Sequence, residues 1–444
     1  METGARPVRS RRWFVILTAA LASSGAAASL PAQELTLDEC IELALARTPG
    51  LAAEAARTRE ATSDYALARA PLRPQISATA YSNRLNEGRL SPGGFTGEPG
   101  VSLYTRESFI GLTARQLLYD GGRRTGEREA SARALDGQRA GLAAARDETV
   151  LRVKQAFYRA LGAGEFVRVA QNVLKRQQAF EAMTTDFFHA GKATRLDALK
   201  AEAARLDAER SLTAAHETEV VAAVQLAQAM GLDGAARVTA RGTLPQDLAE
   251  APLAETAIQA AVAGNPDLQR AAHQIEQGRQ AVRSARGGKR PELAVQGTYG
   301  YRERDVGGAR ADWLMGLTAS WAIYTGGAKS AQVAKAQARL AEAQELRRAL
   351  QLDIEAQVLE ALAGWRTALS DARAAMRLVE TEREAVLAAE TLYGAGKATA
   401  LDALTAQADL ARAEGAQVAA LTDYTIAGAR VARLTGASST ETTR

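Results

Sequence analysis

The chain has 444 residues, of which 47% are hydrophobic and 24% are charged, so its composition excludes a disordered protein and permits a sizeable core. Its formal net charge is +4, but residues 1–32 contain four arginines and one acidic residue, which leaves about +1 on the remainder. The charge therefore gives no evidence for a nucleic-acid partner. The single cysteine, Cys40, excludes an intrachain disulfide.

Residues 1–32 are predicted to be a secretory signal peptide. Arginines precede the apolar run at residues 13–21, and small residues follow up to a cleavage site expected near residues 28–32. The apolar run is too short for a transmembrane helix. The SRRWF sequence at residues 10–14 also resembles a twin-arginine signal, but a general secretory signal is the favoured interpretation. Cys40 has no lipobox context, so we interpret it as a half-buried helix residue and not as a lipid anchor.

The first half begins with two predicted helices, which are followed by two predicted strands. Thr36 and Glu39 have the spacing of a capping box at the start of a helix. A second helix is expected to begin at Pro49. Apolar and polar residues then alternate over about residues 75–84 and 108–119, a pattern typical of strands.

A very long helix and a sharp reversal complete this half. Residues 122–188 contain no proline and are predicted to form a helix about 100 Å long, at roughly 1.5 Å per residue. The tip segment, residues 189–197, is expected to reverse the chain at Gly191, and Thr194 can cap the return helix.

The two halves, residues 33–230 and 253–436, are copies of one unit. The sequences AGKATRLDAL and AGKATALDAL begin at Ala190 and Ala395, 205 residues apart, and agree at nine of ten positions. Matching segments nearer the start of each half are 217 residues apart, so the first half carries 12 extra residues. The turn-rich loop at residues 88–100 accommodates them. Matched segments at a fixed offset indicate an internal repeat.

The second half is expected to contain the same elements in the same order. They are strands over about residues 292–303 and 312–324, a long helix over residues 326–393, and a tip at residues 394–402. A linker is predicted at residues 231–252 and a short polar tail at residues 437–444.

The alternation in the strands favours a membrane β-barrel. Each strand has about 9–11 residues, which is enough for a tilted strand to cross a bilayer, with apolar side chains on one face and polar ones on the other. Trp313 and Trp321 are expected near the two ends of the last strand, as membrane-facing aromatics at the lipid interface. The alternative is a β-sandwich hairpin with these tryptophans in its core, but four strands in an otherwise helical chain argue against it.

The sequence contains no pattern expected of a catalytic or metal site. His189, His216 and His273 are widely spaced and lack neighbouring ligand residues, so we interpret them as solvated helix histidines. The Gly191-Lys192 pair lacks the glycine-rich lead and the following hydroxyl residue of a phosphate-binding loop. We therefore predict that the protein is not an enzyme and has no cofactor and no metal site.

An aromatic residue, a glycine, a threonine and an aspartate recur at three-residue intervals at each tip, and this pattern resembles that of the TolC family of outer-membrane efflux proteins. Its members here are Phe188, Gly191, Thr194 and Asp197, then Tyr393, Gly396, Thr399 and Asp402. The resemblance covers nearly all of the chain beyond the signal peptide. It implies a mainly α fold with a membrane β-barrel, in which each chain forms two repeats of helix, hairpin, long helix and return helix. Three chains would form a shared twelve-stranded β-barrel and a periplasmic α-helical tunnel.

The resemblance also implies a function and a set of partners. A homotrimer in the outer membrane, with a long periplasmic portion, would act as the passive exit duct of a tripartite efflux pump or of a type I secretion system. It would contact outer-membrane lipid, a periplasmic adaptor (membrane fusion protein) and an inner-membrane pump of the RND or ABC type.

Three groups of tip residues receive expected roles from the resemblance. Asp402 and Thr405 are expected at the channel entrance, where some relatives carry a second aspartate at the position of Thr405. Tyr393 and Asp197 are expected to form a latch that holds the tip closed. The expected adaptor-docking residues surround the two tip glycines: Gly191, Lys192, Thr194, Gly396, Lys397 and Thr399.

Two other classes of protein remain open at this stage. One is a periplasmic coiled-coil tether without a pore, which extraction from membranes without detergent would favour. The other is a secreted helical enzyme, which turnover by the purified protein would support. The alternation in the strands argues against both.

Overall fold

The computed structural model describes residues 33–84, 106–233, 238–304 and 308–436. Three predicted segments lie outside the described residues: the signal peptide at 1–32, the loop at 88–100 and the tail at 437–444.

The first repeat passes from two helices through a β-hairpin into a long helical hairpin. Its elements are α1 (Leu37–Arg47), α2 (Pro49–Arg69), β2 (Gln75–Arg84), β3 (Arg106–Tyr119), α3 (Arg123–His189) and α4 (Arg195–Ala229). Local sequence explains the early boundaries. Thr36 and Glu39 form the capping box of α1, and Pro49 is the first residue of α2, where its missing N–H costs nothing.

The second repeat has the same order of elements. They are α5 (Ala254–Gly264), α6 (Pro266–Gly287), β5 (Glu292–Arg304), β6 (Gly308–Ser320), α7 (Ala328–Gly394) and α8 (Ala400–Thr435). A short strand before α1, β1 (Gln33–Leu35), pairs in parallel with β4 (Val238–Ala240). This pairing ties the segment between the repeats to the start of the first one.

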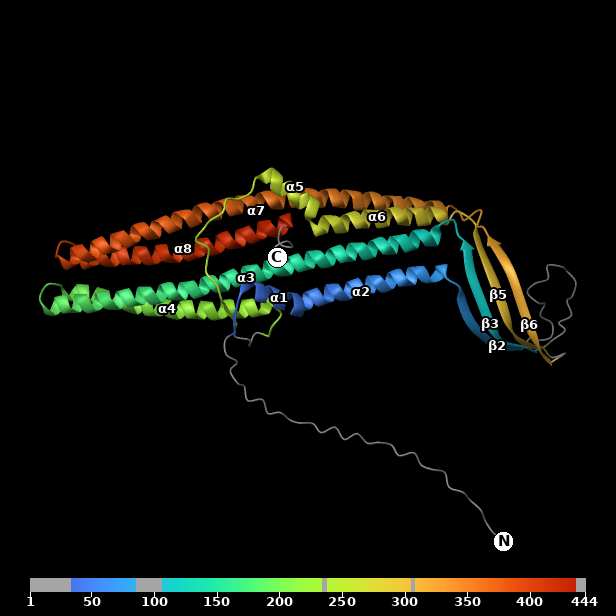
Figure 1. The fold of residues 1–444 in the computed structure, drawn as a ribbon, viewed down its shortest axis with the longest axis horizontal. Helices are drawn as coiled ribbons and strands as arrows, with labels where there is room; N and C mark the ends of the chain where they lie inside the picture. The colour runs from blue at the N-terminus through green and yellow to red at the C-terminus, as the bar shows by residue number, and fades with distance from the viewer. Residues whose placement is uncertain (1–32, 85–105, 234–237, 305–307, 437–444) are drawn as a thin grey trace, which may run out of the picture.

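The molecule is elongated, with the strands at one end and the two helical turns at the other (Figure 1). Helices α3 and α7 have 67 residues each, which corresponds to about 100 Å. The α3/α4 hairpin lies beside the α7/α8 hairpin, and α3 packs against α8 along part of its length. Among the described residues, no helix contains an apolar stretch long enough to cross a membrane.

Two buried clusters hold the middle of the molecule together. In the first repeat, α1, α3, α4 and β4 enclose Cys40, Phe157, Leu226 and Met230. Cys40 is fully buried and not half-buried as expected, and this burial raises the pKa of its thiol to about 11. In the second repeat, the apolar residues of α7, including Val358, pack against α5, α6 and α8.

The four longer strands form one antiparallel sheet in the order β2-β3-β5-β6, so the pairing of β3 with β5 joins the two repeats. Strand β6 begins and ends about four residues earlier than expected. Pro291 precedes β5 and has no N–H for a ladder, and pairing of β5 with β6 therefore stops at Glu292 and Ser320. As a result, Trp313 lies in the middle of β6 and Trp321 just beyond its end, which corrects the expected placement of Trp313 near a strand end.

Candidate functional site

Both tips reverse the chain through a left-handed glycine. Gly191 and Gly396 have φ values of 72° and 71°, a conformation that L side chains rarely adopt. The N–H of Lys192 donates to the carbonyl oxygen of Phe187 at 2.8 Å, and Lys397 makes the equivalent bond in the second tip. A Cβ added to either glycine would meet nothing within 4 Å. The turn therefore requires glycine for its backbone angles, while the space beside each glycine is open.

Reciprocal caps follow both glycines. The hydroxyl of Thr194 donates to the carboxylate of Asp197 at 2.7 Å and accepts from the backbone N–H of Asp197 at 3.2 Å. Thr399 and Asp402 form the same pair of bonds with the same distances. Hydrogen bonds from the threonine hydroxyl and then from its backbone N–H lower the pKa of each aspartate. Each aspartate carboxylate thus forms part of the capping box at the start of its own helix.

The expected entrance residues lie close together near the start of α8. Asp402 is exposed in the first turn, and Thr405 is exposed one turn later, where its hydroxyl donates to the carbonyl oxygen of Leu401 at 2.8 Å. Thr405 also lines a groove of about 750 Å³ between α8 and the α3/α4 hairpin. Alanine is the most frequent residue of the groove wall, to which α3 also contributes Phe166 and Val173.

The expected latch does not form within the chain. Tyr393 is only 7% exposed, and its ring packs against the rings of Phe180 and Phe187, with centroids 5.4 and 5.7 Å away. Its hydroxyl is buried and has no hydrogen-bond partner among the described residues. Asp197 bonds Thr194 instead. The Tyr393–Asp197 bond is therefore absent within the single chain, and the latch stays a prediction.

The expected docking residues are all exposed, and they lie in the tips, at the end of the molecule far from the strands (Figure 1). They are Gly191, Lys192, Thr194, Gly396, Lys397 and Thr399. The two tips present the same residues in the same backbone conformation, so the chain offers two copies of one small surface.

At the other end, the sheet has one apolar face and one polar face. Ala78, Leu112, Tyr299 and Trp313 lie opposite one another across the four described strands, and their neighbours on the same face are also apolar. The intervening residues, such as Thr113, lie on the other face because side chains alternate along a strand. Within the described chain the apolar face is largely exposed.

The polar face carries a charged and aromatic cluster that our sequence analysis missed. Arg302 forms ion pairs with Glu107 and Asp312, and it donates to the hydroxyl of Tyr81 at 3.2 Å. Its guanidinium lies 5.1 Å from the ring centroid of Phe109. The cluster joins β2, β3, β5 and β6, and it therefore ties both repeats together across the sheet.

Glycine makes room for this cluster. The ring of Phe109 lies over Gly111, where a Cβ would come within 2.5 Å of the ring. Glu107 near the start of β3 and Arg302 near the end of β5 carry opposite charges, and both were visible in the sequence. Their meeting depended on the register between the repeats, which the sequence alone did not give.

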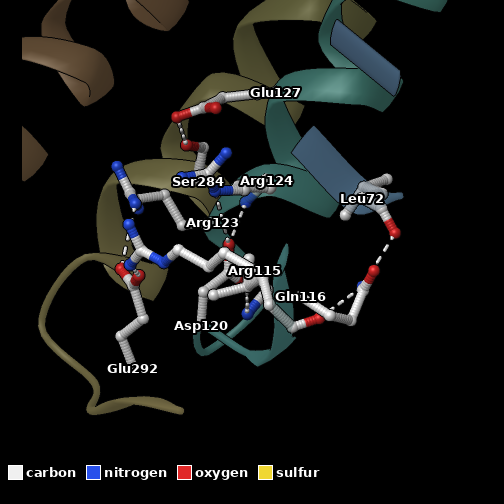
Figure 2. Close-up of polar contacts among 11 residues, drawn as sticks. Leu72, Arg115, Gln116, Asp120, Arg123, Arg124, Glu127, Ser284 and Glu292 are labelled. Carbon is white, nitrogen blue, oxygen red and sulfur yellow. Dashed lines mark hydrogen bonds and ion pairs between the residues drawn. The ribbon is translucent and has the colours of Figure 1, made fainter. Parts of the chain in front are cut away.

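A second polar network joins the strands to the long helices, as Figure 2 shows. Glu292 accepts from Arg115 of β3 at 3.2 Å and from Arg123 of α3 at 3.3 Å. Asp120, which is buried, accepts from the backbone N–H groups of Gly122 and Arg124 at 3.0 and 2.8 Å and so caps α3. The network therefore links the start of the first long helix to strands β3 and β5.

The described residues contain no cluster of side chains able to hold a metal ion. The arrangement instead provides a sheet with a lipid-compatible face, two long helical hairpins and paired exposed tips.

Comparison with known proteins agrees with this architecture. The outer membrane efflux protein family matches residues 40–232 and 257–437, one segment in each repeat. The chain is 24% identical over 392 residues to the outer membrane efflux protein BepC of Brucella suis biovar 1 (strain 1330), covering 84% of this chain and 79% of that protein.

Solved outer-membrane channels share the fold. The CmeC channel of Campylobacter jejuni aligns with a TM-score of 0.77 at 17% identity, covering 90% of this chain and 85% of that one. The open state of the MtrE channel of Neisseria gonorrhoeae aligns with a TM-score of 0.74 at 22% identity, covering 90% and 88%. The fold class and the outer-membrane location predicted from the sequence are confirmed. The chain belongs to the outer membrane efflux protein family and is an outer-membrane efflux channel.

Proposed function

We propose that three copies of the chain assemble into the exit duct of a tripartite efflux pump or a type I secretion system. The observation that carries this proposal is the four-stranded sheet, which has one continuous apolar face. The outer edges of its two end strands, β2 and β6, pair with no other strand among the described residues.

Lipid does not tolerate unpaired backbone groups, so a sheet in a membrane must close on itself. Four strands are too few to close one barrel, because even the small membrane barrels use eight. Three sheets joined edge to edge give a twelve-stranded barrel. The apolar face with Leu112 and Trp313 then meets lipid, and the polar face with Thr113 and Arg302 lines the lumen.

Beyond the barrel, the helical hairpins of three chains enclose a tunnel. Helices α3 and α7 run away from the sheet for about 100 Å, a length suited to crossing much of the periplasm. The groove between α8 and the α3/α4 hairpin lies along this part of the molecule.

The tips are the proposed docking surface for a periplasmic adaptor, which in turn would link the duct to an inner-membrane pump of the RND or ABC type. Identical exposed groups on the two tips, including Lys192 and Lys397, suit a partner that repeats around the ring. Asp402 and Thr405 are proposed to face the tunnel entrance. Three copies of Asp402 there would favour cations.

Assembly can be tested by native mass measurement in detergent, together with paired substitutions on the two faces of β3. The intact protein is expected to have the mass of three chains and to require detergent for extraction. Leu112→Arg should abolish membrane insertion, since a cation on the lipid face near the bilayer centre costs about 2–4 kcal/mol per chain. The neighbouring Thr113→Arg should still insert, because it faces the lumen.

A monomer that retains its strand content would contradict the trimer. Equal tolerance of both arginine substitutions would contradict the membrane barrel. Extraction without detergent would favour the alternative function of a periplasmic tether without a pore.

A further inference from the structure

The two tips have nearly the same sequence but occupy different environments. Tyr393 in the second tip is 7% exposed, whereas Phe188, 205 residues earlier at the equivalent position of the first tip, is 38% exposed. Tyr393 is covered because Phe180 and Phe187 of the α3/α4 hairpin pack on it. The flank of the first tip that carries Phe188 has no such cover among the described residues.

The internal repeat identifies the residues that would cover Phe188. The counterpart of Phe187, 205 residues later, is Leu392, and the counterpart of Phe180 is Ala385. Both are exposed on α7, and Leu392 is 45% exposed despite being apolar. The chain therefore exposes Phe188 on one hairpin and Leu392 and Ala385 on the other. The equivalent residues, Tyr393 with Phe187 and Phe180, are packed together between the two hairpins of the chain.

We propose that Phe188 of each protomer packs against Leu392 and Ala385 of the neighbouring protomer at the tip. The proposal rests on the trimer described above. Three chains place six hairpins in a ring, so the free flank of the first hairpin faces the second hairpin of the next chain. We call the contact between hairpins of neighbouring protomers the seam between protomers, and the contact between the two hairpins of one chain the seam within a protomer. The two seams then consist of residues that are equivalent by the internal repeat.

The two kinds of seam differ in strength. Within a protomer, the side chain of Glu414 on α8 is 10% exposed, and it accepts from Arg176 of α3 at 2.7 Å. The counterparts of these two residues are Glu209 and Thr381, which cannot form an ion pair with each other. Glu209 pairs with Arg205 of its own helix at 2.5 Å instead.

The apolar packing is also weaker between protomers than within one. The aromatic ring of Phe180 is replaced by the methyl group of Ala385, so less apolar surface is buried between protomers than within one. Ala400, which is buried within the protomer, corresponds to exposed Arg195. The seam between protomers is therefore the weaker of the two at the tip.

Paired cysteines and a short, reducible bis-methanethiosulfonate cross-linker test this directly. Phe188→Cys with Leu392→Cys probes the seam between protomers. Its matched control is Phe187→Cys with Tyr393→Cys, the same pair of positions shifted by one repeat. Native Cys40 can remain, because it is fully buried and its raised pKa keeps it as a thiol.

The first pair is expected to give covalent dimers and trimers, and the control pair an internally linked monomer. If the first pair disturbs assembly, Phe188→Cys with Ala385→Cys probes the same seam.

The outcomes separate this inference from the proposal on which it rests. A trimer in detergent in which neither seam pair links between chains would overturn the contact but leave the duct standing. A monomer would overturn the duct itself.

Discussion

The carboxylate of Asp402 accepts two hydrogen bonds from one residue, Thr399, at 2.8 Å from its backbone N–H and at 2.7 Å from its hydroxyl. The same arrangement joins Asp197 to Thr194 in the first tip. The entrance to the proposed tunnel is thus built from ionised caps, and its local stability depends on the charge of these two aspartates.

This dependence predicts that both tips loosen in acid. Because the folded pKa of each aspartate is lowered, its contribution to stability is complete above the ordinary aspartate pKa of about 4 and is lost as the pH falls through the lower, folded value. Hydrogen exchange, corrected for the intrinsic effect of pH, should show loss of protection at residues 194–198 and 399–403 below about pH 4. In Asp197→Asn/Asp402→Asn protein this extra loss should be absent. An identical acid response in the variant would assign the loosening to other groups.

A second prediction concerns the hydroxyl of Tyr393. The hydroxyl is buried and lacks a partner among the described residues, so removing it leaves no bond unmade. Tyr393→Phe should therefore leave the melting temperature and the resting conductance unchanged or should stabilise the tip slightly. Tyr393→Ala should cost about 3 kcal/mol, because it empties the space between Phe180 and Phe187. A rise in resting conductance with Tyr393→Phe would contradict this prediction and would show that the hydroxyl forms a polar latch with a neighbouring protomer.

The sequence predicted the features that depend on local chemistry. Glycine, threonine and aspartate at fixed spacing determine each tip turn and cap without help from distant residues. The strands were likewise visible as alternation, and the repeat gave the order of elements. The tip and strand patterns could be predicted because they depend on residues only a few positions apart.

Features that depend on which surfaces meet could not be read in the same way. Phe188 and Tyr393 occupy equivalent positions, and only the packing of one hairpin on the other decides that the second is buried. The cluster around Arg302 needed the register of β3 against β5, two strands from different repeats. The same packing buries Tyr393 against Phe180 and Phe187, so no bond to Asp197 forms within the chain.

A third prediction compares the starts of the two long helices. The carboxylate of Asp120 accepts from two backbone N–H groups at the start of α3, at 3.0 and 2.8 Å, whereas Thr325 at the equivalent position bonds through its backbone carbonyl, which accepts from the N–H of Ala328. Asp120→Ala should destabilise the protein by about 1–2 kcal/mol per chain. Thr325→Ala should change stability by less than about 0.5 kcal/mol. Thermal unfolding in detergent measures both, and equal effects would show that the cap at Asp120 carries no special weight.

The last prediction uses the buried ion pair between the hairpins. Glu414 accepts from Arg176 at 2.7 Å and has Arg383 of α7 at 3.7 Å, so it holds α8 against both long helices. Removing one partner leaves a charge poorly compensated, while replacing both by apolar residues avoids that penalty. Glu414→Leu alone should therefore cost about 2–3 kcal/mol per chain, less than a fully buried pair because Arg176 is partly exposed.

The double variant Arg176→Leu/Glu414→Leu should recover most of this loss. Glu209, the repeat counterpart of Glu414, provides the control: its side chain is 44% exposed, and Glu209→Leu should cost less than about 1 kcal/mol. Denaturation of these variants, together with the single variant Arg176→Leu, in one detergent gives the coupling energy of the pair. If the double variant is no more stable than Glu414→Leu, the carboxylate stabilises the hairpin contact by packing or through Arg383, and the Arg176 pair is not what joins the two hairpins.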